Sequence, residues 1–164
     1  MLAVGYMTAV GKKKVKDVEL WPDGTEIPAW FSDTSRVDVS GLKRYVVTDY
    51  GVDRWADGVQ TKELQAVIDK CAAEGGGVVV IPRGTFLSGS LFFKPKTHLL
   101  IEEGGELKGS DRIRDFQIVK TRMEGQTLNY FAALVNADGV DGFTITGPGT
   151  INGNGQKYWE EFWI

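Results

Sequence analysis

The sequence predicts an all-β fold, a solenoid in which short parallel strands stack on one another along the chain. The first observation is a motif that occurs three times, beginning at Ile81, Ile101 and Ile145. In each copy Leu or Ile follows six residues after the first Ile, Gly follows eight residues after it, and Ser or Asn follows nine residues after it. The second observation is the spacing, because the first two copies begin 20 residues apart and the third begins 44 residues later. Repeats of roughly 20–50 residues are typical of solenoids, whose units bury their apolar sides only by stacking on their neighbours.

The composition is that of a globular domain, and it excludes several classes of protein. The chain of 164 residues carries a net charge of −3 and has no basic run beyond Lys12–Lys14, so we expect no nucleic-acid partner. The lone Cys71 excludes an internal disulfide and a Cys-based zinc site, and the lone His98 excludes a His cluster. No apolar stretch is long enough to span a bilayer. We therefore expect no membrane span and no metal or other cofactor.

The start of the chain, residues 1–20, is expected to be a leader or linker, and residues 21–164 are expected to belong to a single solenoid domain. Met1 to Val10 are apolar and rich in small residues, but they lack the positively charged start and the full length of a signal peptide. This segment is either the remnant of an incomplete signal peptide or a simple unstructured start.

One clear helix is expected from about residue 62 to residue 73. Thr61 is the expected N-cap, and glycines 75–77 end the helix. The apolar residues follow the helical period and form one stripe: Leu64, Val67, Ile68 and Cys71. We expect this stripe to cover the first turn of the solenoid, because an uncovered end would expose apolar side chains and unpaired backbone groups.

The pattern changes from helix to strands at Val78. The main strands expected are Val78–Ile81, Leu87–Phe93, His98–Ile101, Ala133–Asn136 and Phe143–Thr146. The shared offsets of the three motif copies predict two inward-facing stacks, one of Ile81, Ile101 and Ile145 and the other of Leu87, Leu107 and Ile151. His98, after a Lys-Pro-Lys turn, is expected to be a surface or turn residue.

Polar residues in the loops are expected to have structural roles. Asp138 and Asp141 each precede a glycine, which is a turn signature, and we favour that role over a catalytic acid–base pair. A set of aspartates at four-residue intervals lacks the ligand spacing of a calcium loop: Asp49, Asp53 and Asp57. Three asparagines are expected to stack as side-chain amides at successive corners, with sugar contact as the alternative: Asn136, Asn152 and Asn154.

The last seven residues, Tyr158–Ile164, form an aromatic run with no polar finish. We expect the sequence to be the N-terminal part of a longer solenoid, cut short after its first turns. Such a chain ends in an open strand edge with exposed apolar side chains, and we expect it to self-associate through this C-terminal edge.

The order of the segments resembles that of a known family. The segments that carry the resemblance are Asp57-Gly58, Leu64–Asp69, Gly75–Pro82, Gly84–Phe86, Ser88–Leu91, Leu99–Gly104 and Ile145–Gly153. From about Tyr45 to Trp159 the chain resembles the start of the polygalacturonase-like glycoside hydrolases, family 28. This family belongs to the pectate-lyase-like superfamily of right-handed parallel β-helices, so the resemblance implies that fold.

The resemblance also implies a function, an inverting hydrolase that acts on polygalacturonate or rhamnogalacturonan and is secreted or periplasmic. The family's catalytic carboxylates lie in an Asn-Thr-Asp segment and an Asp-Asp pair, followed by Gly-His-Gly and Arg-Ile-Lys, and none of these occurs in this sequence. We therefore assign no catalytic residue here and expect the chain alone to be inactive. The alternatives are a β-helix polysaccharide lyase or epimerase and a non-catalytic carbohydrate-binding β-helix.

Residues 111–130 interrupt the strand pattern with a charged excursion, and long excursions in compact proteins are often functional. Arginine forms a planar fork that matches the carboxylate of a uronate, and an aromatic ring suits the face of a sugar. The candidate substrate-binding residues are therefore Arg122, Glu124, Asn129 and Tyr130. The alternative is a solvated loop with local ion pairs.

Overall fold

The computed structural model describes residues 19–34 and 38–162. The chain divides into two units, Met1–Arg36 and Val37–Ile164. The expected leader lies almost wholly outside the described residues, as do the last two residues of the aromatic run. In the first unit the short 3-10 helix η1 (Ala29–Phe31) follows a turn. The rings of Trp21 and Phe31 pack edge to face, with 4.7 Å between their centroids.

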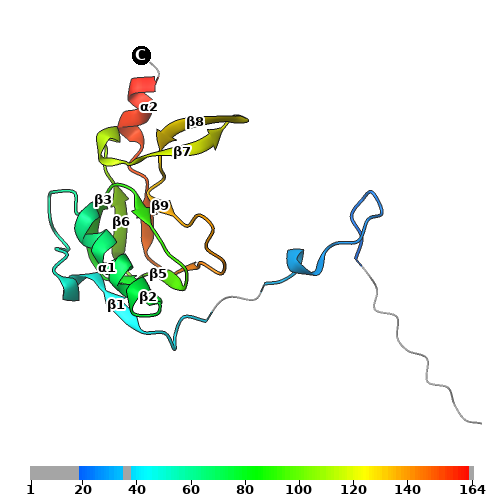
Figure 1. The fold of residues 1–164 in the computed structure, drawn as a ribbon, viewed down its shortest axis with the longest axis horizontal. Helices are drawn as coiled ribbons and strands as arrows, with labels where there is room; N and C mark the ends of the chain where they lie inside the picture. Colours follow the sequence, from blue (N-terminus) through cyan, green and yellow to red (C-terminus); the bar gives the residue numbers. More distant parts are fainter. Residues whose placement is uncertain (1–18, 35–37, 163–164) are drawn as a thin grey trace, which may run out of the picture. The chain divides into compact units, whose positions relative to one another are not determined.

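The second unit is built mainly from strands in parallel sheets, as the sequence predicts (Figure 1). The four strands of the first sheet lie in the order β1 (Arg44–Val46), β2 (Gly77–Ile81), β5 (Thr97–Ile101) and β10 (Ile145–Thr146). The second sheet holds β3 (Gly84–Ser88), β6 (Gly105–Gly109) and β11 (Thr150–Asn152). The third pairs β4 (Leu91–Phe92) with β9 (Val135–Asn136). The chain thus passes from sheet to sheet and returns to stack each new strand on an earlier one, in parallel.

The register of the strands corrects both expected inward stacks, beginning with the one that contains Leu87. Ile81 pairs with Ile101 and both are buried, as expected, but Gly84 pairs with Gly105, so the second copy has one more residue in its turn. After that turn the motif is therefore out of register by one residue. Phe86, and not Leu87, pairs with Leu107 and is buried. The expectation for Leu87 was wrong because a shift of one residue moves a strand side chain to the opposite face.

The strands of the third motif copy lie at an exposed edge of their sheets. Ile145 pairs with Leu99, two residues before the expected partner, and Ile151 pairs with Leu107. Ile145 and Ile151 remain 47% and 42% exposed, so neither is buried as the two stacks predict. Their strands, β10 and β11, are the last in their sheets and have a neighbour on one side only among the described strands.

The helix α1 (Thr61–Ala73) lies where the sequence predicts it, and its apolar stripe is buried in the main hydrophobic cluster together with Val79, Ile81 and Leu99. It ends before Gly75 and Gly76, which adopt positive φ angles of 100° and 103°. The expected cap was wrong, because Gln60 is the N-cap residue and makes no side-chain bond to the helix. The hydroxyl of Thr61 instead accepts a hydrogen bond from the backbone N–H of Gly89 at 2.7 Å.

The side chains of the asparagines bind the backbone and Glu106 rather than one another's side chains. The Nδ2 atom of Asn136 donates to the carbonyl oxygen of Leu91 at 3.0 Å, from β9 to β4. The Nδ2 of Asn152 donates to Glu106 at 2.8 Å, and that of Asn154 donates to the carbonyl oxygen of Gly109 at 3.0 Å. Each bond joins neighbouring strands or their ends, so these side chains hold successive strands in register.

The remaining elements are short. They are the 3-10 helices η2 (Val47–Tyr50) and η3 (Ile113–Asp115), the strands β7 (Ile118–Met123) and β8 (Gln126–Phe131), and the helix α2 (Gln156–Phe162). None of the helices in the described part of the chain has the length and apolar character that crossing a bilayer requires.

Candidate functional site

From Ile118 onward the charged excursion forms a β-hairpin, which the sequence did not predict. β7 and β8 pair in antiparallel register from Ile118 with Phe131 to Met123 with Gln126. The turn is Glu124-Gly125, with φ angles of 50° and 83°. The hairpin projects from the parallel sheets at the end of the unit where α2 lies (Figure 1).

The base of the hairpin is anchored to the turn between β3 and β4. The hydroxyl of Ser90, which is buried, accepts a hydrogen bond from the backbone N–H of Gln117 at 3.2 Å and donates to the carbonyl oxygen of Ala132 at 3.3 Å. The N–H of Ala132 in turn donates to the carbonyl oxygen of Gln117 at 2.8 Å. Both strands of the hairpin therefore leave the sheets from one hydrogen-bonded point.

The register places two of the four candidate residues on one face of the hairpin. Residues directly opposite each other in an antiparallel pair point to the same face. Lys120 faces Asn129, and Arg122, two residues on, faces Thr127. Arg122 and Asn129 thus share a face with Lys120, and all three are exposed.

The other two candidates lie elsewhere on the hairpin. Tyr130 pairs with Val119 on the opposite face, and the centroid of its ring lies 4.2 Å from that of the adjacent Phe131. Glu124 is in the turn, exposed, with a left-handed backbone. The structure therefore does not bring all four candidates together.

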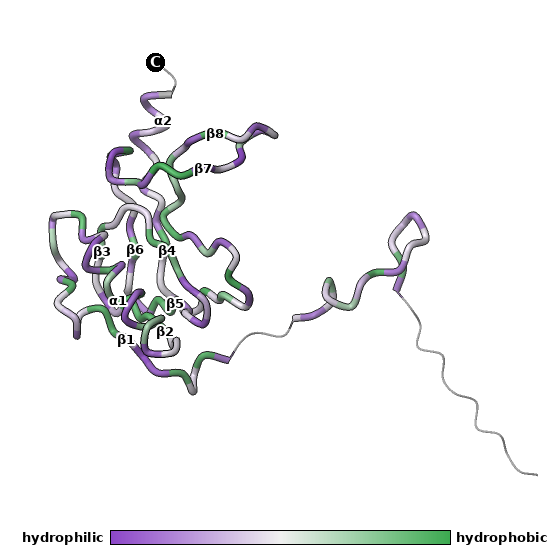
Figure 2. The backbone as a smooth tube through the Cα atoms, viewed as in Figure 1, coloured by the Kyte–Doolittle hydropathy of each residue, from purple (hydrophilic) through white to green (hydrophobic). Residues whose placement is uncertain are grey.

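The face that holds Arg122 is cationic. Neither Lys120 nor Arg122 forms an ion pair with any residue that the structure describes. The hairpin turn is hydrophilic and the start of β7 is hydrophobic (Figure 2). We refer to Lys120, Arg122 and Asn129 as the cationic hairpin face. It offers hydrogen-bond donors to an anion, because ammonium and guanidinium groups are donors only.

Sequence reasoning missed Lys120 because it did not recognise the strand pairing around Glu124-Gly125. The signal available was a turn-forming dipeptide between two runs of six residues, but these runs alternate weakly in hydropathy. Only the cross-strand register shows that Lys120 and Asn129 are direct partners.

Asp138, Asp141 and His98 were also considered from the sequence. Asp138 and Asp141 lie in turns followed by Gly139 and Gly142 with positive φ angles, which confirms the turn interpretation. Over residues 19–34 and 38–162 no cluster of three His, Cys, Asp or Glu side chains could hold a metal ion. His98 lies within β5, between the buried Thr97 and Leu99, and is itself half-buried.

Comparison with known proteins gives three informative relatives. The chain is 29% identical over 119 residues to the exo-poly-α-D-galacturonosidase of Dickeya chrysanthemi, which covers 68% of this chain and 19% of that protein. The family 28 exopolygalacturonase of Yersinia enterocolitica superposes with a TM-score of 0.62 at 30% identity, over 69% of this chain and 21% of its own. The resemblance to the family 28 polygalacturonases is confirmed.

A third relative supports the fold alone. The hyperthermoactive exopolygalacturonase of Thermotoga maritima superposes with a TM-score of 0.66 at 23% identity, over 75% of this chain and 27% of its own. No family model matches the sequence. The chain thus spans between 19% and 27% of the length of these three relatives.

Proposed function

We propose that this chain is part of an inverting glycoside hydrolase that acts on pectic polysaccharide, either polygalacturonate or rhamnogalacturonan. The observation that carries the proposal is the identity of 29–30% to two proteins named as an exo-poly-α-D-galacturonosidase and an exopolygalacturonase. Inversion requires a general acid and a base-activated water on opposite sides of the bond, with carboxyl groups roughly 6.5–9.5 Å apart. Since the family's catalytic segments do not occur in this sequence, the whole protein supplies those carboxylates from another part of its chain.

The fold that goes with this function is a right-handed parallel β-helix, of which the parallel strands of the second unit form the first turns. Its support is the three parallel sheets, in which the chain returns to each sheet in turn, and the resemblance to family 28. α1 has the role of a cap in this proposal, because its buried stripe packs on the first strands of the stack.

The hairpin supplies substrate contacts in the proposed enzyme. Arg122 and Asn129, together with Lys120, bind the carboxylates of successive uronate units, since a guanidinium matches a carboxylate in a planar fork. Glu124 at the turn accepts hydrogen bonds from sugar hydroxyls, and Tyr130 offers an aromatic ring on the opposite face. A polymeric substrate lies outside the cell, so the proposed enzyme is secreted or periplasmic.

The experiment is a reducing-end assay on polygalacturonate and on rhamnogalacturonan. It compares the 164-residue chain with a polypeptide extended to the length of the relatives. We expect turnover by the extended polypeptide and none by the short chain. Turnover by the short chain that disappears in an Asp138→Asn, Asp141→Asn double variant would overturn the assignment of the catalytic carboxylates to another part of the protein, because the two turn aspartates would then be the catalytic pair.

The same assay tests the cationic hairpin face. Arg122→Gln in the extended polypeptide should raise KM and leave kcat unchanged, since the residue contributes uniform binding and touches no reacting atom. Lys62→Gln, an exposed cation on the first turn of α1, is the matched control and should change neither constant. An unchanged KM for Arg122→Gln would remove the hairpin from the binding site.

A further inference from the structure

A second charged site lies beyond the hairpin, between the segment that follows β6 and the helix α2. A cavity of about 350 Å³ is lined there by Asp111, Arg112, Arg114, Lys157, Tyr158 and Glu161, together with Ile113. Ligand cavities in proteins are typically roughly 300–1,000 Å³, so its size is at the lower end of that range. We call it the α2 pocket. None of its residues was a candidate from the sequence.

The cations of the α2 pocket are only loosely neutralised. The Nε of Arg112 and the Nζ of Lys157 lie 3.8 Å and 3.9 Å from the two oxygens of Asp111. These distances exceed those of hydrogen bonds, so one carboxylate is shared between two cations without binding either closely. Arg114 has no ion pair with any residue that the structure describes. The pocket is therefore lined by three cations and two anions, and most N–H donors of the cations are free for a ligand.

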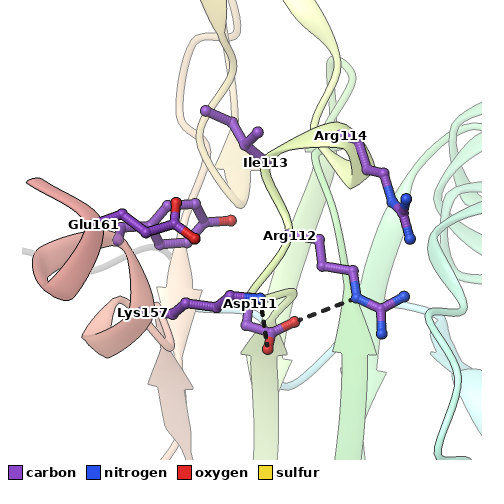
Figure 3. A pocket seen from close by; sticks show the side chains of 7 residues that line it. Asp111, Arg112, Ile113, Arg114, Lys157 and Glu161 are labelled. Carbon is purple, nitrogen blue, oxygen red and sulfur yellow. Dashed lines mark ion pairs between the residues drawn. The ribbon is translucent and has the colours of Figure 1, made fainter.

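The charges are also separated within the pocket. Arg112 and Arg114 extend from their segment on the side away from Glu161, while Lys157 reaches from α2 toward Asp111 (Figure 3). One end of the pocket therefore offers guanidinium donors for a carboxylate, and the other offers a carboxylate that accepts hydrogen bonds from hydroxyls. A sugar that carries one carboxylate and several hydroxyls matches this arrangement, because an ionised carboxyl group only accepts.

The backbone that holds the two arginines is fixed. The hydroxyl of Ser110, which is buried, accepts from the N–H of Arg112 at 3.1 Å and donates to the carboxylate of Asp115. The hydroxyl of Tyr158 donates to the carbonyl oxygen of Ser110 at 3.1 Å, which joins α2 to the same residue. Burial, and then the charges of Asp111, Asp115 and Glu161, raise the pKa of Tyr158, so its phenol remains a neutral donor at physiological pH. Ser110 thus positions both walls of the pocket.

We propose that the α2 pocket is a subsite for one uronate unit of the anionic polysaccharide, with its carboxylate bound by Arg112 and Arg114. The inference rests on the proposed function for the identity of the polymer. It adds a binding site on α2 that is separate from the cationic hairpin face. Lys157 increases the positive potential at the site, and Glu161 accepts hydrogen bonds from the sugar hydroxyls.

The test is NMR titration of the ¹⁵N-labelled chain with a galacturonate oligomer and, separately, with its methyl-esterified form. We expect the acid form to shift the amide signals of residues 111–115 and 156–161, and the ester to shift them much less. Arg112→Gln combined with Arg114→Gln should weaken binding by about tenfold, since hydrogen bonds between charged groups are among the strongest in proteins. Lys62→Gln, on α1, should leave the affinity unchanged.

The outcomes separate this inference from the proposed function. Shifts confined to residues 118–131 would overturn the subsite and leave the proposed substrate in place. Equal shifts with the acid and the ester would overturn carboxylate recognition. No shift anywhere with the acid form would overturn the subsite, and turnover of polygalacturonate by the extended polypeptide would then show whether the proposed function still stands.

Discussion

Gly89, in the turn after β3, is a position where no side chain fits. A Cβ at this residue would overlap the carbonyl oxygen of Asp115, and it would also lie 3.2 Å from the hydroxyl of Thr61. The same turn binds α1, because the N–H of Gly89 donates to that hydroxyl. The close approach thus joins the start of α1, the end of β3 and the segment that carries Arg112 and Arg114.

We expect Gly89→Ala to destabilise the chain by roughly 1–3 kcal/mol, because the atom that the new methyl group meets belongs to the backbone and cannot rotate away. Gly58→Ala is the matched control, since a Cβ there meets nothing within 4 Å and should change stability by less than about 0.5 kcal/mol. Both are measured by urea denaturation followed by circular dichroism. Equal midpoints for the two variants would show that the turn is free to move.

Glu74, just beyond the end of α1, is bound by three partners. Its carboxylate accepts from the Nζ of Lys43 at 2.5 Å, the Nζ of Lys70 at 2.6 Å and the hydroxyl of Tyr45 at 2.9 Å. The hydrogen bond from Lys43, followed by those from Lys70 and Tyr45, lowers the pKa of Glu74 from 4.5 to about 2. The carboxylate therefore links β1 to the end of α1.

A lowered folded-state pKa makes stability depend on pH in a definite direction. The contribution of Glu74 is fully present above its unfolded pKa of 4.5 and is lost as the pH falls through about 2. We expect Glu74→Gln to be less stable than the wild type at pH 7 and to lose less stability than the wild type between pH 5 and pH 2. Added salt should narrow the difference, because the lysines are largely exposed. Parallel pH profiles for the two proteins would contradict this account.

At the scale of elements, the sequence correctly predicted the helix, which depends on a local pattern of apolar residues. It did not predict the side chains and strands whose positions depend on the register between paired strands. The stripe of α1 follows the helical period, so both its position and its buried face were correct. Leu87 was assigned inward because motif offsets were counted through a turn that has one more residue in its second copy. β7 and β8 were missed because their residues alternate weakly in hydropathy, and their pairing follows from a two-residue turn.

In the candidate site, too, the sequence indicated the residue types but not the strand pairing that brings them together. The chemistry of Arg122 and Asn129 was available from residue type and position in an excursion. Their common face with Lys120 was not, since it depends on the pairing of β7 with β8. The α2 pocket joins residues separated by more than 40 positions, and no sequence pattern indicates that Arg112 and Lys157 line one cavity.

The buried stripe of α1 provides the prediction for elements. Ile68 is fully buried against the cluster that contains Val79 and Leu99, so Ile68→Asp places an unpaired carboxylate among apolar side chains. We expect a loss of roughly 3–5 kcal/mol, which combines the lost apolar burial and the cost of a buried charge. Ala66→Asp, on the exposed side of the same helix, is the control for helix propensity alone and should cost about 0.5 kcal/mol. Thermal unfolding that is equal in the two variants would show that the stripe does not hold α1 on the sheets.

At the scale of the whole second unit, the two ends of the strand stack differ. The edge of β3 is covered by the segment that precedes α1. The N–H of Thr85 donates to the carbonyl oxygen of Arg54 at 3.0 Å, and the carbonyl oxygen of Leu87 accepts from the N–H of Gln60 at 2.9 Å. At the other end, β9, β10 and β11 each have a strand neighbour on one side only among the described residues. An unpaired strand edge beside exposed apolar side chains is a template for pairing with another chain.

We therefore expect the 164-residue chain to self-associate through β10 and β11 as its concentration rises, as measured by sedimentation velocity. Ile145→Lys combined with Ile151→Lys should keep it monomeric, because charges at an edge oppose the addition of a further strand. Ile118→Lys is the control, since Ile118 is 61% exposed but lies on the hairpin, and it should leave the association unchanged. If the Ile118 variant abolished association and the double edge variant did not, the hairpin would be the contact surface. A wild-type chain that stays monomeric at all concentrations would show that the open edge does not suffice for pairing.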